Sequence, residues 1–278
     1  MKKINRRSFL AAAGLTAAAL ALTACGGSAS STASSTASSA ASSEAASTSA
    51  AAELTTVEAG KLTMATNAAF PPYEMTTDAG EFEGIDIDTA KAIAEKLGLE
   101  LQIDDMDFDA ALLSVQQGKA DIVMAGVTVT DERKAVMDFS DSYATGIQSI
   151  IVPEGSDIAS PDDLAGKKIG TQRGTTGYIY CTDDFGEDNV IAYDDGLTAV
   201  QALNNGQVDA VVIDNAPAQE FVAANPGLKV LDTSYAEEDY AIGMAKGSAL
   251  EDAVNKALEE LKADGTLQAI VDKYITAE

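Results

Sequence analysis

The sequence predicts an α/β fold in two lobes, preceded by an export signal and a flexible tether. Strand-like and helix-like stretches alternate from about residue 61 to the end of the chain. The order of elements repeats once, and each half holds about 90 residues, which is enough for a lobe with its own core. Such alternation builds parallel sheets that carry helices on both faces.

The composition of the chain excludes several classes of function. Of 278 residues, 18 are Lys or Arg and 44 are Asp or Glu, so the formal net charge is −26. Removal of a leader that ends before Cys25 takes away four cations and leaves 14 − 44 = −30. Such a chain repels polyphosphate, so we expect no nucleic-acid partner. The absence of His excludes His-dependent catalysis and His metal sites, and two Cys are too few for a zinc or disulfide framework. We therefore expect no metal and no other cofactor.

Residues 1–24 have the features of a signal peptide. A basic stretch precedes an apolar run of 14 residues, 9–22, which is shorter than the roughly 20 residues that span a bilayer. The run ends in Leu22-Thr23-Ala24-Cys25, which resembles the bacterial lipobox, in which the chain is cleaved before a Cys that carries a lipid. An ordinary secretory peptide with an incidental Cys is the alternative. Residues 6–10 also resemble a twin-arginine signal, which leaves the export route open.

Residues 25–58 are predicted to be a lipidated Cys25 followed by a tether. Residues 26–52 are Gly, Ser, Thr and Ala apart from Glu44, and such a segment cannot bury enough apolar surface to fold. A lipid, a tether and a folded part together place the protein at the outer face of the cytoplasmic membrane.

The first half of the folded part is expected to alternate strands and helices. The expected elements are strand 61–66, helix 86–97, strand 99–104, a helix from 107 to 118, strand 121–125 and a short helix from 130 to 136. The helix over 86–97 has its apolar residues on one face and stops at Gly98. Thr130 has a side chain that can cap a helix N-terminus.

The second half repeats this order. The expected elements are a helix opened by Ser160-Pro161, strand 168–170, strand 209–213, a helix near residue 216 and helices from 248 to 265 and 266 to 274. Proline is favoured at the first position of a helix. Residues 116–126 and 204–214 resemble each other as helix end, glycine and buried strand, although chance similarity between α/β units is an alternative.

The most informative residues follow the predicted strands, because open α/β sheets bind ligands beyond the carboxyl ends of their strands. Arg133 comes soon after the strand that ends at Ala125, and it is one of two arginines beyond Cys25. An arginine can hold a carboxylate with two hydrogen bonds. A solvated pair with Glu132 or Asp131 is the alternative.

Asp214 ends an apolar strand, where a carboxylate needs a cationic partner. Its alternative role is the N-cap of the next helix. Thr175 and Thr176 lie at a helix start, whose free N–H groups suit an anion. Phe70 and Tyr73, on a loop with two prolines, suit a ligand wall, as does Phe108; packing on the core is the alternative.

Two other patterns carry no site. Asp105, Asp107 and Asp109 lack the Gly and Glu that a calcium loop needs at its sixth and twelfth positions, so Asp107 is predicted to be a helix cap. Cys181 is expected to be a small buried residue. The remaining constellation offers an Arg and N–H groups to a carboxylate, an Asp to an ammonium, and aromatic rings between them. That describes a site for a free α-amino acid.

The folded part is similar to the solute-binding proteins of family 3, which bind polar amino acids for ABC importers. The resemblance is carried by seven stretches: 65–73, 84–88, 106–108, 125–133, Phe139-Ser140, Gly174-Thr175-Thr176 and 208–214. It implies a type II periplasmic-binding-protein-like fold with the ligand in a cleft between two lobes. Two crossover strands are expected near 143–147 and 238–242. The first lobe then holds 59–145 and 241–278, and the second holds 146–240.

The resemblance also implies roles for individual residues. Arg133 would clamp the α-carboxylate, with help from the N–H groups of Thr128 and Thr176. Asp214, the Gly126 carbonyl and the Thr128 hydroxyl would hold the α-ammonium. Phe70 and Phe108 would enclose the ligand, and Asn67, Tyr73 and Gln172 would face its side chain. Val127 and Thr175 belong to the same loops and complete the expected ligand-binding set.

Departures from the family pattern bear on the ligand. Several relatives have Asp where this chain has Asn67, which favours an amino acid with a neutral side chain. The glutamine binder has Lys and His where this chain has Gln172 and Ile213, which argues against glutamine itself.

The function implied is capture of a free L-amino acid by a monomeric lipoprotein that delivers it to the permease and ATPase of an ABC importer. We expect no enzymatic activity. One alternative is a dehydratase-like enzyme on the same scaffold, for which Glu74 is the nearest candidate acid or base. Another is a ligand-sensing surface lipoprotein.

Overall fold

The computed structural model describes residues 54–275. The predicted signal peptide, Cys25 and all but the last few residues of the predicted tether lie outside the described residues. Within 54–275, no helix has both the length and the apolar character needed to cross a membrane.

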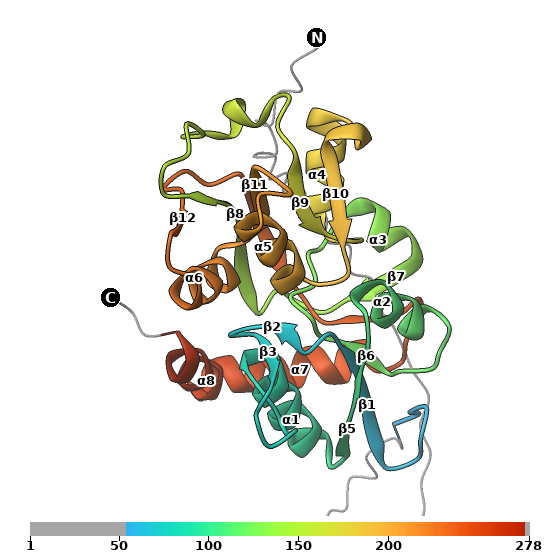
Figure 1. Cartoon of the computed structure of the whole chain (residues 1–278). Coiled ribbons are helices and arrows are strands. Elements are labelled where there is room, and N and C mark those ends of the chain that lie inside the picture. The colour runs from blue at the N-terminus through green and yellow to red at the C-terminus, as the bar shows by residue number, and fades with distance from the viewer. Residues whose placement is uncertain (1–53, 276–278) are drawn as a thin grey trace, which may run out of the picture. The chain divides into compact units, whose positions relative to one another are not determined.

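The first sheet has five strands in the order β5-β1-β6-β14-β7 (Figure 1). Its strands are β1 (Lys61–Thr66), β5 (Glu100–Asp105), β6 (Ile122–Val123), β7 (Met137–Phe139) and β14 (Gly243–Ala245). The helices that accompany it are α1 (Ile85–Leu97), α2 (Phe108–Gln116), α3 (Asp131–Val136), α7 (Glu251–Ala263) and α8 (Thr266–Tyr274). A small third sheet, which the sequence did not predict, is formed by β2 (Ala69–Phe70), β3 (Glu74–Thr76) and β4 (Phe82–Glu83).

The second sheet has the order β10-β9-β11-β8-β12, and β13 pairs with β8. Its strands are β8 (Ala144–Pro153), β9 (Ile169–Gln172), β10 (Val190–Tyr193), β11 (Ala210–Asp214), β12 (Leu228–Val230) and β13 (Ala236–Tyr240). Its helices are α4 (Thr176–Phe185), α5 (Gly196–Asn204) and α6 (Asn215–Ala224), with short 3₁₀ turns at η1 (Pro161–Leu164) and η2 (Glu187–Asn189).

Successive side chains of each central strand belong to two different hydrophobic clusters. In β1, Met64 packs with the cluster that includes α1 and α7, while Ala65 packs with the cluster that includes α2. In β11, Val211 and Val212 likewise belong to clusters on opposite faces of the second sheet. Successive side chains of a strand point to opposite faces, so a continuous apolar strand is buried on both sides. The predicted helices on both faces are confirmed.

The prediction of parallel sheets is wrong in part. β1, β5 and β6 are parallel to one another, as are β9, β10 and β11. The strands β8, β12, β13 and β14 are antiparallel to their neighbours. Three of these strands, β8, β13 and β14, flank the two crossings between the sheets, which simple strand–helix alternation does not reveal.

Several predicted elements differ in extent. The strand Lys61–Thr66 and the helix Thr266–Tyr274 have the bounds that were predicted. The strand expected over 121–125 is only Ile122–Val123, and the helix opened by Ser160 is a 3₁₀ turn with a capping box. Thr130 caps α3 by accepting a hydrogen bond from the Arg133 N–H. Asp107 occupies the N-cap position of α2, but its side chain accepts no capping hydrogen bond there.

The chain passes between the two sheets twice, from β7 to β8 and from β13 back to β14. β8 and β13 pair antiparallel over their shared length, with Glu238 opposite Gly146. The two segments that cross between the sheets therefore pair with each other, so the two crossings lie side by side.

Gly146 is needed at this crossing because a side chain there would meet Tyr240. A Cβ at Gly146 would lie 2.4 Å from the Tyr240 ring. We expect Gly146→Ala to lower the free energy of unfolding by about 1–3 kcal/mol, the usual cost of overpacking a core. Urea unfolding measures the change. Gly155→Ala is the matched control, because no heavy atom of the described residues lies within 4 Å of a Cβ there; an equal loss in both variants would contradict the packing argument.

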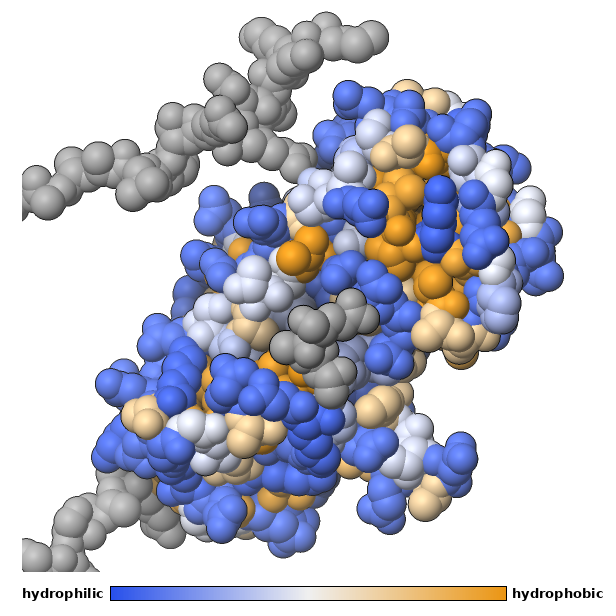
Figure 2. Space-filling view, turned by 90° about the vertical axis from the view of Figure 1, so that its left-hand side faces the viewer, coloured by the Kyte–Doolittle hydropathy of each residue, from blue (hydrophilic) through white to orange (hydrophobic). Residues whose placement is uncertain are grey.

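One face of the folded part is largely polar (Figure 2). Figure 2 shows one face that is mostly hydrophilic, with hydrophobic residues gathered on its upper part. Figure 2 is the view of Figure 1 turned about the vertical axis, so its upper part is the part of the molecule that contains the second sheet.

Candidate functional site

The strand ends converge on one cavity, as the sequence predicted. It is lined by Asn67, Phe70, Glu74, Phe108, Ala125, Gly126, Thr128, Arg133, Gln148, Gln172, Thr175, Thr176, Val212, Ile213, Asp214 and Tyr240. Residues from both sheets contribute, because the carboxyl ends of β1, β9 and β11 and the loop after β6 all face it. Ten of the twelve predicted ligand-binding residues lie here.

The other two predicted residues lie elsewhere. Val127 is fully buried in the hydrophobic cluster beside α2. Tyr73 is buried behind Phe70, with the two ring centroids 5.8 Å apart, and it also contacts Tyr240 edge-on at 5.5 Å. For Tyr73 the structure therefore favours the alternative of packing on the core, while Phe70 lines the cavity itself.

Arg133 is a buried cation whose hydrogen bonds go to neutral groups. Its side chain donates to the Thr128 carbonyl at 2.8 Å and to the Gly174 carbonyl at 3.1 Å, and the residue is 8% exposed. Among residues 54–275 it forms no ion pair, which excludes the alternative of a solvated pair with its acidic neighbours. Burial lowers the pKa of Arg133, and nearby carboxylates, first Glu238, oppose that shift. A buried guanidinium without a counter-ion can receive an anionic group.

Asp214 is the corresponding buried anion. It is 2% exposed and accepts hydrogen bonds from the N–H groups of Ile147 at 2.7 Å and Ala216 at 3.0 Å. The bond to Ala216 makes Asp214 the N-cap of α6, so that alternative is confirmed. Burial raises the pKa of Asp214 to about 6, although both N–H groups and the Tyr240 hydroxyl lower it. Although Asp214 caps α6, its carboxylate still lines the cavity, so it can also bind a cation.

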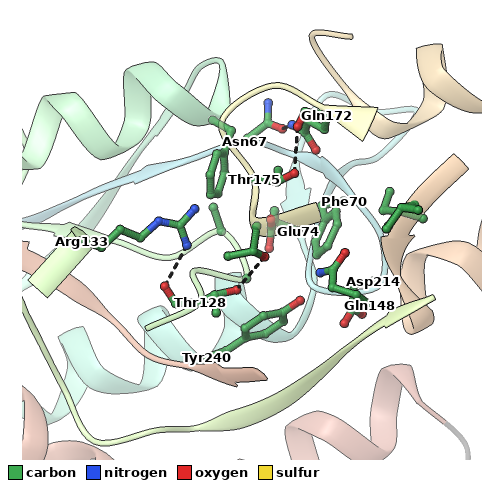
Figure 3. Close-up of a pocket in the computed structure, with 16 residues that line it drawn as sticks. Asn67, Phe70, Glu74, Thr128, Arg133, Gln148, Gln172, Thr175, Asp214 and Tyr240 are labelled. Atoms are coloured by element: carbon green, nitrogen blue, oxygen red, sulfur yellow. Dashed lines mark hydrogen bonds between the residues drawn. The ribbon is translucent and has the colours of Figure 1, made fainter. Parts of the chain in front are cut away.

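Figure 3 shows how these two charges are placed. Arg133 approaches from one side of the cavity, and Asp214 lies at the other side, beyond the Phe70 ring. Phe108 packs beside Arg133, with the guanidinium carbon 5.3 Å from the ring centroid. The cavity therefore has a cationic end, an anionic end and aromatic walls.

The two lobes touch around the cavity. Gln172 Nε2 donates to Asn67 Oδ1 at 2.9 Å, and Arg133 reaches the Gly174 carbonyl. The hydroxyl groups of Thr128 and Thr176 are 3.4 Å apart. Each contact joins a residue of the first lobe to a residue of the second, so the positions of the site residues depend on how the lobes meet.

Glu74 is a cavity residue that the sequence did not place in the ligand-binding set. It is 0% exposed, and neither of its oxygens has a hydrogen-bond donor among residues 54–275. Burial and the carboxylates of Asp86, Asp105 and Asp214 raise the pKa of Glu74 well above its usual value. Once Glu74 holds a proton, its hydroxyl can donate to Asp86, whose free oxygen is also buried. Asp86 in turn accepts from the Gly126 N–H at 3.0 Å and the Tyr143 hydroxyl at 2.8 Å.

Five further cavity residues were missed: Ala125, Gln148, Val212, Ile213 and Tyr240. Gln148 offered a signal, since it lies beside Ser149 at the start of an apolar run and a buried amide needs partners. Tyr240 offered none, because its place at the cavity depends on the crossing between the lobes. Cys181 is buried as expected, and burial raises the pKa of its thiol to about 12.

The buried carboxyls predict how stability depends on pH. Burial raises the pKa of Asp86 and of Asp214 to about 6, so between about pH 4 and 6 the folded state binds more protons than the unfolded state. The free energy of unfolding therefore rises as pH falls through 6. From pH 7 to pH 5 each group contributes on the order of 1 kcal/mol.

Urea unfolding at pH 7 and pH 5 tests this dependence. Asp214→Asn should remove on the order of 1 kcal/mol of the gain on acidification. Asn can still cap a helix, and any loss that does not depend on pH cancels in the difference. An equal gain in the variant and the wild type would contradict the assignment.

Comparisons with known proteins agree with this architecture. The chain is 33% identical over 284 residues to a probable histidine-binding protein of Neisseria gonorrhoeae, covering 99% of this chain and 98% of the relative. Among solved structures it resembles the arginine-, lysine-, histidine-binding protein ArtJ of Geobacillus stearothermophilus (35% identity, TM-score 0.75, 78% of this chain and 96% of ArtJ). It also resembles an ancestral arginine-binding protein bound to glutamine (43% identity, TM-score 0.75, 78% and 99%).

These relatives share the two-lobed α/β fold while their names give different amino acids. The family model of the bacterial extracellular solute-binding proteins, family 3, matches residues 62–277. The match spans both sheets and every residue that lines the cavity. The chain therefore belongs to the bacterial extracellular solute-binding proteins, family 3.

Proposed function

We propose that this protein captures a free L-amino acid outside the cytoplasmic membrane and delivers it to the permease and ATPase of an ABC importer. The observation that carries the proposal is the pair Arg133 and Asp214: two buried opposite charges without ion-pair partners among residues 54–275, one from each lobe, on one aromatic-walled cavity. A zwitterion would place its carboxylate at Arg133 and its ammonium at Asp214. Because these groups belong to different lobes, the ligand would favour the arrangement in which the lobes meet.

The remaining predicted residues would complete the site. The hydroxyl of Thr128 and the carbonyl of Gly126 would share the ammonium, and the N–H groups of Thr128 and Thr176 would share the carboxylate. Asn67 and Gln172 are joined by a hydrogen bond at one side of the cavity, where the ligand side chain would lie. We propose a neutral side chain from the presence of Asn67, while Glu74 supplies a second hydrogen-bonding group.

We propose the membrane anchor and the lobe boundaries that the sequence predicts. A lipid on Cys25 would hold a monomer at the outer face of the membrane through the tether. The lobes would comprise 59–145 with 241–278, and 146–240. Cys25→Ser should release the protein from the membrane fraction if the lipid anchors it.

A thermal-shift screen against the common amino acids and cystine tests the proposed function, followed by calorimetry on each hit. We expect at least one amino acid to raise the melting temperature and to bind one molecule per chain. A complete screen without a shift would contradict the proposal.

The dehydratase-like alternative has one observation in its favour. Glu74 is a buried carboxyl with a raised pKa on the cavity, which is the usual state of a general acid. Recovery of the bound amino acid after long incubation separates the two functions. A binding protein returns it unchanged, whereas an enzyme returns a product.

A further inference from the structure

Glu238 is a buried carboxylate that lies behind the cavity wall. It sits on β13, is 6% exposed, and uses one oxygen, Oε2, to accept two hydrogen bonds. The donors are the Thr128 hydroxyl at 3.1 Å and Gln148 Nε2 at 3.0 Å, and both donors line the cavity. Its other oxygen is buried and has no partner among residues 54–275. Thr128 comes from the first lobe and Gln148 from β8, so Glu238 connects wall residues from two parts of the fold.

The bond to Glu238 determines which way the Thr128 hydroxyl points. A carboxylate only accepts hydrogen bonds, so Thr128 must be the donor. The single proton of the hydroxyl is then directed away from the cavity, and the lone pairs of Oγ1 remain as acceptors. The neighbouring Thr176 hydroxyl, 3.4 Å from Thr128 Oγ1, must accordingly be the donor in that contact.

The backbone holds this arrangement in place. The Val129 N–H donates to the Asp239 carbonyl at 3.0 Å, and the Ala241 N–H donates to the Val127 carbonyl at 3.1 Å. The segment around Thr128 thus runs antiparallel beside the end of β13, with Thr128 paired to Tyr240. The distance between Glu238 and Thr128 is therefore set by backbone pairing rather than by flexible side chains.

We propose that Glu238 is a positioning residue for the amino-acid site: it orients the Thr128 hydroxyl so that an acceptor, and not a proton, faces the ligand ammonium. The inference rests on the proposed function. It predicts that Glu238 affects binding of the ammonium through Thr128, without touching the ligand itself. It also predicts that the position of the carboxylate oxygen, within hydrogen-bond distance of Thr128, matters more for binding than the charge of the carboxylate.

Two conservative variants separate the effect of side-chain length from the effect of charge. Glu238→Asp keeps the charge and withdraws the acceptor by one methylene. Glu238→Gln removes the charge, and its amide oxygen can still accept from both donors. The probes are two amino acids with neutral side chains, each paired with the compound that lacks only its α-ammonium: L-asparagine with succinamic acid, and L-methionine with 4-(methylthio)butanoic acid. Calorimetry gives the Kd of each variant for each probe.

We expect Glu238→Asp to raise the Kd of the amino acid about tenfold, as for the loss of one hydrogen bond. The Kd of the compound without the ammonium should change less than about threefold, and Glu238→Gln should change the amino-acid Kd less than about threefold. A merely structural role would weaken both compounds alike. Equal losses for both compounds, or a Gln variant as weak as the Asp variant, would overturn the inference.

A second test uses Thr128→Val, which removes the hydroxyl and keeps the side-chain shape. In that background, adding Glu238→Asp should change the amino-acid Kd less than about twofold, because both substitutions remove the same interaction. A further tenfold loss would show that Glu238 does not act through Thr128. If the wild-type protein bound no amino acid, the proposed function would fall and the inference with it; a wild type that binds while these patterns fail overturns the inference alone.

Discussion

Replacing Arg133 by alanine is expected to weaken amino-acid binding by about 3–5 kcal/mol, roughly a hundredfold to a few thousandfold in Kd. The guanidinium is buried, and among residues 54–275 it has no anionic partner of its own. A ligand carboxylate that enters the cavity loses its water, so removal of Arg133 leaves that carboxylate buried without a counter-charge. Calorimetric titration of the wild type and the variant measures the difference.

The other arginine of the folded part provides a matched control. Arg173 is exposed, and its nearest carboxylate, Asp194, is 3.8 Å away at the surface. Arg173→Ala should leave the Kd within about threefold, because exposed ion pairs contribute little. The ligand-free Arg133→Ala protein should also unfold cooperatively. A folded Arg133 variant whose affinity fell less than about threefold would exclude the carboxylate clamp.

The second large effect is expected at the other end of the cavity. Asp214→Asn removes the anionic charge that would meet the ligand ammonium and keeps a side chain of the same size. We expect the amino acid to bind about 2–5 kcal/mol more weakly, the range for truncating one partner of a buried charge pair. A ligand analogue without the ammonium should lose much less, because it has no cation to place there.

Calorimetry with the amino acid and its analogue measures this difference directly. Asp209→Asn is the control, since Asp209 precedes the same strand, is exposed, and accepts a hydrogen bond from the Lys168 backbone. It should change neither affinity. Equal losses for both compounds in Asp214→Asn would assign the effect to damage of the α6 N-terminus and not to the ammonium.

Much of the fold follows from local patterns in the sequence. The strand Lys61–Thr66 and the helix ending before Gly98 have apolar periodicities and stop signals that depend only on neighbouring residues. Crossover strands were expected near 143–147 and 238–242 from the family resemblance, but their antiparallel pairing was not predicted, because β8 and β13 pair across about 90 residues of intervening chain. Register between such distant segments depends on tertiary packing, which a local pattern does not contain.

The site shows the same division. Arg133 stood out as one of two arginines beyond Cys25, and Asp214 as a carboxylate at the end of an apolar strand; both lie on the cavity. Tyr73 was expected there from its place beside Phe70, but the turn of the loop directs it to the core. Glu238 gave no signal, since an acidic residue in an acidic stretch predicts exposure. Only the pairing of β13 with β8 buries it beside Thr128.

The crystal structure of the protein with a bound amino acid tests the central claim most directly. We predict a ligand carboxylate oxygen within hydrogen-bond distance of the Arg133 guanidinium and the ligand nitrogen within the same reach of the Asp214 carboxylate, between the Phe70 and Phe108 rings. An amino acid bound outside this cavity, or bound inside it with its ammonium and carboxylate directed away from these two residues, would contradict the account.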